Sequence, residues 1–69
     1  MITLREREVM DRVAQGLTND RIAEELHVSV HAVKFHLASV YRKLGVANRT
    51  EATAWYVTEL ARDSRMVGS

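Results

Sequence analysis

The residues best suited to chemistry in this sequence lie in one stretch, from Leu26 to Thr50, which contains no carboxylate. Its basic and imidazole side chains are Lys34, Arg42, Lys43, Arg49, His27, His31 and His36. All 9 acidic residues lie outside this stretch, so the net charge of +1 hides a local excess of cations. Because lysine and arginine bind phosphate oxygens by charge-assisted hydrogen bonds, the stretch is a candidate surface for a polyanion such as nucleic acid.

Metal binding and acid–base catalysis are two weaker interpretations of the sequence. His27 and His31 have a spacing that suits a metal on a continuous helix, but the residues between them are expected to break the helix, and no third ligand is nearby. Glu6 and Glu8 are candidate groups for acid–base catalysis, but no nucleophile or oriented base accompanies them, and the sequence has no phosphate loop. We therefore expect no metal site and no cofactor, and we expect the protein not to be an enzyme.

The length and composition predict one small soluble domain. The chain has 69 residues, of which 46% are hydrophobic, and it contains neither proline nor cysteine. Such a composition favours helices joined by short turns and excludes disulfides. No apolar run approaches the roughly 18 residues of a membrane span, and the N-terminus lacks the apolar core of a signal peptide. We expect a cytoplasmic protein without membrane contacts.

Helix caps and hydrophobic periodicity predict an all-α, four-helix bundle-like domain, with helices over residues of about 4–15, 19–26, 30–44 and 49–62. Thr3 with Glu6, and Asn48 with Glu51, have the spacing of capping boxes, in which each side chain accepts the other residue's backbone N–H. Further start and stop signals are Thr18, Ser29, Gly16 and Gly45. The domain is expected to cover residues 1–63, followed by a disordered tail at 64–69.

The second and third predicted helices are joined by only a few residues, which is the spacing of a helix-turn-helix. When the third helix is laid out at about 100° per residue, its apolar residues Val33, Leu37, Val40 and Leu44 share one sector. The opposite sector contains His31, Lys34, Phe35, Ala38 and Arg42, with Ser39 at its border. This outer sector holds no acid, so the third helix is the element predicted to enter a phosphate-lined groove.

The fourth predicted helix is more apolar than packing on three other helices requires. Ala52, Tyr56 and Leu60 form one stripe for the core, while Ala54, Trp55, Val57 and Ala61 extend apolar surface around the helix. The surplus predicts a second surface that another subunit buries, although Trp55 could instead cover the edge of the core. For Arg49 we favour a structural tie to the first helix, through a carboxylate such as Glu6, over phosphate binding.

Several spaced motifs lie along the chain: Leu4-Arg5-Glu6-Arg7-Glu8-Val9-Met10, Gly16-Leu17-Thr18-Asn19, Ile22-Ala23-Glu24-Glu25-Leu26, Val28-Ser29, Val33-Lys34-Phe35-His36, Lys43-Leu44-Gly45-Val46 and Arg49-Thr50-Glu51-Ala52. Together they resemble the LuxR-type (NarL/FixJ) helix-turn-helix domain. The resemblance covers roughly residues 3–60 and implies a four-helix domain that binds double-stranded DNA as a homodimer and regulates transcription.

The resemblance also implies roles for individual residues. It places Thr18, Asn19, Lys34, Phe35 and Ala38 at the DNA. From their position in the acid-free stretch we add four further expected DNA contacts, Ser29, His31, Arg42 and Lys43. The expected dimer contacts on the fourth helix are Thr53, Ala54, Val57 and Ala61. Arg42 and Lys43 have a second interpretation, because cations near a helix end also complement the helix dipole. Ala32 stands where the family often has threonine, and Phe35 and Ala38 can make only apolar contacts to bases.

Two rival interpretations stay open at this point. The promoter-reading region of a sigma factor uses a similar helix pair, although the capping box at Thr3 and the motif around Arg49 favour the LuxR type. A protein-interaction module could instead use Phe35, Trp55 and Tyr56 as anchors. The resemblance further implies a response regulator or a stand-alone regulator. It allows a receiver or ligand-binding domain before this one in a longer parent protein, and RNA polymerase as a possible partner.

Overall fold

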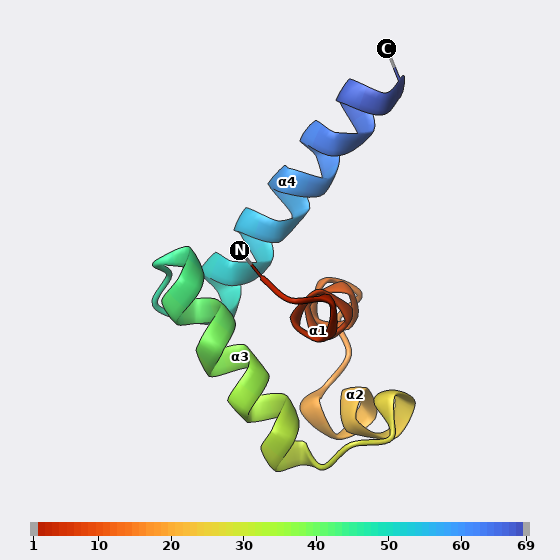
Figure 1. The fold of residues 1–69 in the computed structure, drawn as a ribbon, viewed down its shortest axis with the longest axis vertical. Helices are drawn as coiled ribbons and strands as arrows, with labels where there is room; N and C mark the ends of the chain where they lie inside the picture. The colour runs from red at the N-terminus through yellow and green to blue at the C-terminus, as the bar shows by residue number, and fades with distance from the viewer. Residues whose placement is uncertain (1, 69) are drawn as a thin grey trace.

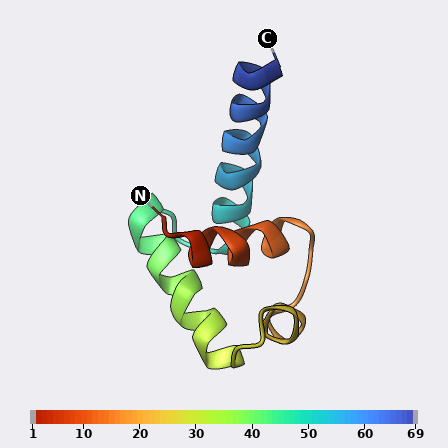
Figure 2. The ribbon, with the colours of Figure 1, turned by 45° about the vertical axis from the view of Figure 1, so that its right-hand side comes forward.

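The computed structural model describes the backbone of residues 2–68 and the side chains of residues 2–62. Its four helices are α1 (Leu4–Ala14), α2 (Asn19–Leu26), α3 (Val30–Leu44) and α4 (Arg49–Gly68). The predicted all-α fold class is confirmed, and the described residues contain no strand. The helix α1 lies in the middle, with α4 above it, α2 below it and α3 beside it at a steep angle (Figures 1 and 2).

Local capping explains where the first three helices begin. Thr3 Oγ1 accepts the Glu6 backbone N–H at 3.1 Å, and the Glu6 carboxylate accepts the Thr3 N–H at 2.8 Å, which confirms the first capping box. The Thr18 hydroxyl caps α2, and the Ser29 hydroxyl caps α3. Each of these side chains satisfies a backbone N–H that has no partner inside its helix.

The turn between α2 and α3 is made by His27, whose left-handed conformation the sequence analysis did not predict. His27 has φ 57° and ψ 43°, which is the left-handed conformation, and its backbone N–H donates to carbonyls of the last turn of α2. This conformation costs roughly 1 kcal/mol in a residue with a side chain, and histidine is among the residues that tolerate it best. The tight turn lets α3 begin at Val30 and pack across α2 as a helix-turn-helix.

Two predictions about α4 need correction. The helix runs to Gly68 instead of ending near residue 62, because no proline or glycine interrupts residues 63–67. The domain boundary at residue 63 stays a prediction, and Ser69 in the expected tail lies outside the described residues. The second capping box is only half formed, since the Glu51 carboxylate accepts the N–H of Ala47 at 2.8 Å in place of that of Asn48.

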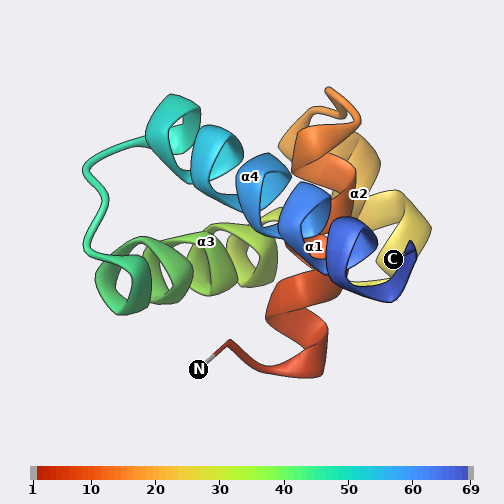
Figure 3. The same ribbon diagram turned by 90° about the horizontal axis from the view of Figure 1, so that it is seen from above.

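The core collects apolar residues from all four helices: Val9, Met10, Val13, Ile22, Ala23, Leu26, Val33, Leu37, Val40, Ala52 and Tyr56. The Tyr56 hydroxyl donates to the Asp11 carboxylate and ties α4 to α1. Burial, together with this hydrogen bond and the charge of Asp11, raises the pKa of Tyr56 to about 12. Seen from above, α4 crosses over α1, and residues 45–48 turn at the far end of α3 (Figure 3).

Candidate nucleic-acid interface

The sector of α3 predicted to face outward is the exposed one in the structure. The outer α3 face, as we call it, consists of His31, Lys34, Phe35, Ala38 and Arg42, which are all exposed. On the opposite side of the helix, Val33 is fully buried. Neither Lys34 nor Arg42 forms an ion pair with a described carboxylate. Both charges can therefore bind an anion from outside the chain.

The residues expected to contact DNA near the starts of α2 and α3 also have structural tasks. The hydroxyl oxygens of Thr18 and Ser29 accept backbone N–H groups from Arg21 at 3.2 Å and Ala32 at 3.0 Å. Both side chains are exposed, and a hydroxyl that accepts a bond can still donate one. Capping therefore does not prevent either hydroxyl from donating to a phosphate oxygen.

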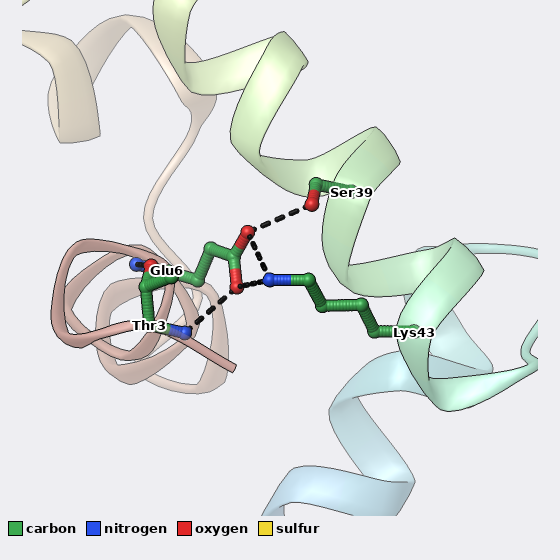
Figure 4. A network of polar contacts seen from close by, with 4 residues as sticks. All are labelled: Thr3, Glu6, Ser39 and Lys43. Carbon is green, nitrogen blue, oxygen red and sulfur yellow. Dashed lines mark hydrogen bonds and ion pairs between the residues drawn. The ribbon is translucent and has the colours of Figure 1, made fainter. Parts of the chain in front are cut away.

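Lys43, which the sequence analysis placed among the DNA contacts, is exposed, but its side chain reaches from α3 to the Glu6 carboxylate on α1 (Figure 4). Its Nζ donates to both carboxylate oxygens of Glu6, at 2.9 and 3.1 Å (Figure 4). The pairing was missed because the two residues lie far apart in the sequence and Glu6 was already explained as a cap. The charge of Lys43 is thus paired with Glu6, whereas Lys34 and Arg42 have no described carboxylate partner.

The Glu6 carboxylate is the centre of a buried polar network that joins α1 to the end of α3. In addition to Thr3 and Lys43, it accepts the Ser39 hydroxyl at 2.7 Å (Figure 4). Burial alone would raise the pKa of Glu6, but the hydrogen bonds from Lys43, Thr3 and Ser39 and the charge of Lys43 outweigh it and lower the pKa to about 2. The carboxylate is therefore ionised at neutral pH and fixes the last turns of α3 against α1.

Arg49 has a structural role, but the predicted tie to the first helix through a carboxylate such as Glu6 is wrong. Its guanidinium donates to the Leu17 carbonyl and, at 2.8 Å, to Asn19 Oδ1. The start of α4 is thereby tied to the start of α2. Because Asn19 Oδ1 faces Arg49, the side-chain amide of Asn19 has its N–H groups left to donate, and no described group accepts them.

The comparison with protein families decides between the interpretations left open by the sequence. A family model described as "Bacterial regulatory proteins, luxR family" matches residues 1–56. The chain belongs to the LuxR family. The family is one of regulators and not of enzymes, which confirms both the predicted resemblance and the predicted absence of enzymatic activity. The chain is the helix-turn-helix DNA-binding domain of a transcriptional regulator.

Relatives of this LuxR-family domain are longer proteins. It is 37% identical over 62 residues to the probable csgAB operon transcriptional regulatory protein of Salmonella typhimurium, which covers 90% of this chain and 29% of that protein. It is 46% identical over 57 residues to the probable transcriptional regulatory protein SgaR of Hyphomicrobium methylovorum, covering 83% of this chain and 27% of SgaR. The chain thus spans less than a third of the length of these curated relatives.

A solved structure supports the fold of the LuxR-family domain. The structure is that of the anti-activator RapF complexed with the DNA-binding domain of the response regulator ComA. It superposes with a TM-score of 0.78 at 38% sequence identity and covers 81% of this chain and 97% of the matched chain. The arrangement of the helices is therefore that of a known DNA-binding domain.

The fourth helix of the LuxR-family domain has an exposed apolar strip where the sequence predicted a dimer contact. Ala54, Val57 and Ala61 are exposed, with Val57 at 49%, while Thr53 is half-buried. Trp55 is only 38% exposed and lines a cavity of about 240 Å³ at the edge of the core. Tyr56 is buried, so it cannot serve as the anchor that a protein-interaction module would need.

Two further findings concern sites outside the interface. Among the described residues, no group of three or more histidine, cysteine, aspartate or glutamate side chains is arranged to hold a metal ion. In the same part of the chain, no helix is both long enough and apolar enough to cross a membrane.

Proposed function

We propose that this domain binds specific sequences of double-stranded DNA with α3 in the major groove. The observation that carries the proposal is the outer α3 face, where Lys34 and Arg42 are exposed and pair with no described carboxylate. The buried side of the same helix is fixed by the core and by the Glu6 network. A rigid helix with an acid-free outer surface matches the shape and the charge of the groove.

Contacts to the DNA backbone would flank the groove contact. The exposed hydroxyls of Thr18 and Ser29 and the amide of Asn19 can donate to phosphate oxygens, and Arg49 holds that amide in one orientation. Helix N-termini also attract phosphate through their free N–H groups and their dipole. These contacts set the register of α3 on the duplex, whereas the outer α3 face reads the bases.

We further propose that two copies pair through α4. Ala54, Val57 and Ala61 share one side of the helix and are exposed, and they follow the spacing of a contact stripe. A two-fold dimer would place two copies of α3 in successive major grooves, about one helical turn apart, so the operator would be an inverted repeat. In this role the domain would be the output unit of a cytoplasmic response regulator or of a stand-alone regulator that works with RNA polymerase.

The DNA proposal predicts a steep salt dependence to which Lys34 contributes. Duplexes selected by the wild-type chain from random DNA should bind less tightly as salt rises, because phosphate contacts release counterions. Lys34→Ala should weaken binding about tenfold per bound copy at about 0.1 M salt and make the logarithmic salt slope shallower by about 1 per copy. Fluorescence anisotropy over a salt series measures both quantities.

The matched control for Lys34 is Arg5→Ala, which removes a cation from an exposed position on α1 that is paired with Glu8. This variant should keep the wild-type affinity and salt slope. Selection that enriches no sequence, or a Lys34→Ala slope equal to that of the wild type, would contradict the placement of α3 in the groove.

The dimer proposal predicts a change of stoichiometry on DNA. Val57→Asp should convert two bound copies per inverted-repeat duplex into one, because a carboxylate in an apolar contact cannot be solvated or paired. Sedimentation equilibrium of the complex measures the ratio. Gln15→Asp, with the same carboxylate on an exposed residue outside α4, should leave two copies bound. Two copies of Val57→Asp on the duplex would exclude this surface as the dimer contact.

A further inference from the structure

The most exposed aromatic side chain of the described residues lies on the outer α3 face. Phe35 is 65% exposed and stands beside Lys34 on this face, with Ala38 less than one turn further along. Val33 and Leu37 are buried on the other side of the helix, so α3 cannot rotate to bring the Phe35 ring into the core without exposing them. A large apolar group held in water at a binding surface predicts an apolar contact in the bound partner.

The ring of Phe35 is also oriented by its neighbour. The Phe35 and His36 rings have their centroids 5.8 Å apart at an interplanar angle of 72°, which is an edge-to-face contact. His36 is half-buried and therefore less mobile than a fully exposed side chain. Together with the Ala38 methyl, the ring makes a small apolar surface that projects from a helix otherwise supplied with cations.

We propose that Phe35 and Ala38 recognise the 5-methyl group of a pyrimidine in the major groove. This inference rests on the proposed function, since it requires α3 to lie in that groove. Neither side chain can donate or accept a hydrogen bond, and the thymine methyl is the apolar feature that base edges present there. The ligand class is therefore duplex DNA with a methylated pyrimidine, either thymine or 5-methylcytosine, opposite Phe35.

The test begins with a duplex that the wild-type chain selects from random DNA. Each thymine is replaced in turn by uracil, which keeps base pairing and removes only the methyl group. At one thymine in each half-site, uracil should weaken binding about fourfold, as expected for one methyl group buried against an apolar surface. At the same position, 5-methylcytosine should bind tighter than cytosine by a similar factor.

The variant Phe35→Ala tests whether Phe35 causes the preference for thymine over uracil. It should bind thymine and uracil duplexes equally, and as an exposed position it should keep the wild-type melting temperature. The matched control is Leu4→Ala, which removes another exposed large apolar side chain, 77% exposed and located on α1. This control should retain the fourfold preference for thymine.

The results separate the methyl contact from the proposed function. Equal binding of thymine and uracil duplexes by the wild type at every position, or a preference that persists in Phe35→Ala, would overturn the methyl contact alone if Lys34→Ala still weakens binding. If no sequence is selected and binding does not depend on Lys34, both the groove placement of α3 and the methyl contact are overturned.

Discussion

Val33→Asp is expected to abolish cooperative folding of the domain. Val33 is fully buried, at 0% exposure, and lies in the core cluster that joins all four helices. A carboxylate there would be buried without a partner, and the apolar burial of the valine would be lost. The combined cost, of about 5 kcal/mol or more, exceeds the few kcal/mol that a domain of this size has available. A thermal melt followed by far-ultraviolet circular dichroism should show no transition.

The adjacent residue provides a matched control for this prediction. Lys34→Asp introduces the same carboxylate one position later, on the outer α3 face. It should melt within a few degrees of the wild type and lose most of its DNA affinity, because a cation in the proposed groove becomes an anion. A folded Val33→Asp or an unfolded Lys34→Asp would show that the two sides of α3 are assigned wrongly.

Glu6→Gln is expected to destabilise the domain at neutral pH and to lose that disadvantage in acid. The pKa of Glu6 is lowered from 4.5 to about 2 in the folded state, so its contribution to stability is complete above pH 4.5 and is lost as the pH falls towards 2. A difference of this size corresponds to about 3 kcal/mol. A glutamine cannot carry the charge that Lys43 pairs with, so it should not show this dependence.

Urea unfolding of the wild type and the variant at a series of pH values from 7 to 2.5 measures the difference directly. The gap in the free energy of unfolding should be largest at pH 7 and should narrow below pH 4.5. The control is Glu8→Gln, at a half-exposed position paired with Arg5 on the surface, where a change of only a few tenths of a kcal/mol is expected. A gap between wild type and Glu6→Gln that is constant over this range would disprove the low pKa.

Most features that depend on a few neighbouring residues were predictable from the sequence, although the second capping box and the end of α4 were not. The first residues of the helices, the caps Thr3, Thr18 and Ser29, and the division of α3 into an inner and an outer side all follow from interactions within about four residues. The family resemblance followed from the same motifs. In each case the residue type and its spacing contain the whole physical reason for the structure.

The features that depend on how the helices cross were not predictable in this way. Lys43 meets Glu6, and Arg49 meets Leu17 and Asn19, only because packing brings distant segments together. From the sequence, Lys43 was therefore interpreted as a surface cation that contacts DNA. Ser39 at the border of the apolar stripe was the one local signal, because a small polar residue that is buried needs a partner. The left-handed His27 had no signal, since glycine or asparagine would be the expected residue there.

On α3, the side chains that pack against the domain are separate from those that face outward, and this separation has a consequence for how the DNA specificity of such domains can change. The side chains that hold the helix, centred on Val33, Leu37 and the partners of Glu6, are separate from the side chains that face outward. Exchanging the outward residues therefore alters neither the packing nor the ion pair between Glu6 and Lys43. One stable scaffold can be redirected to new operators by a few substitutions, in evolution or by design, while every version inherits the same folding and the same acid sensitivity.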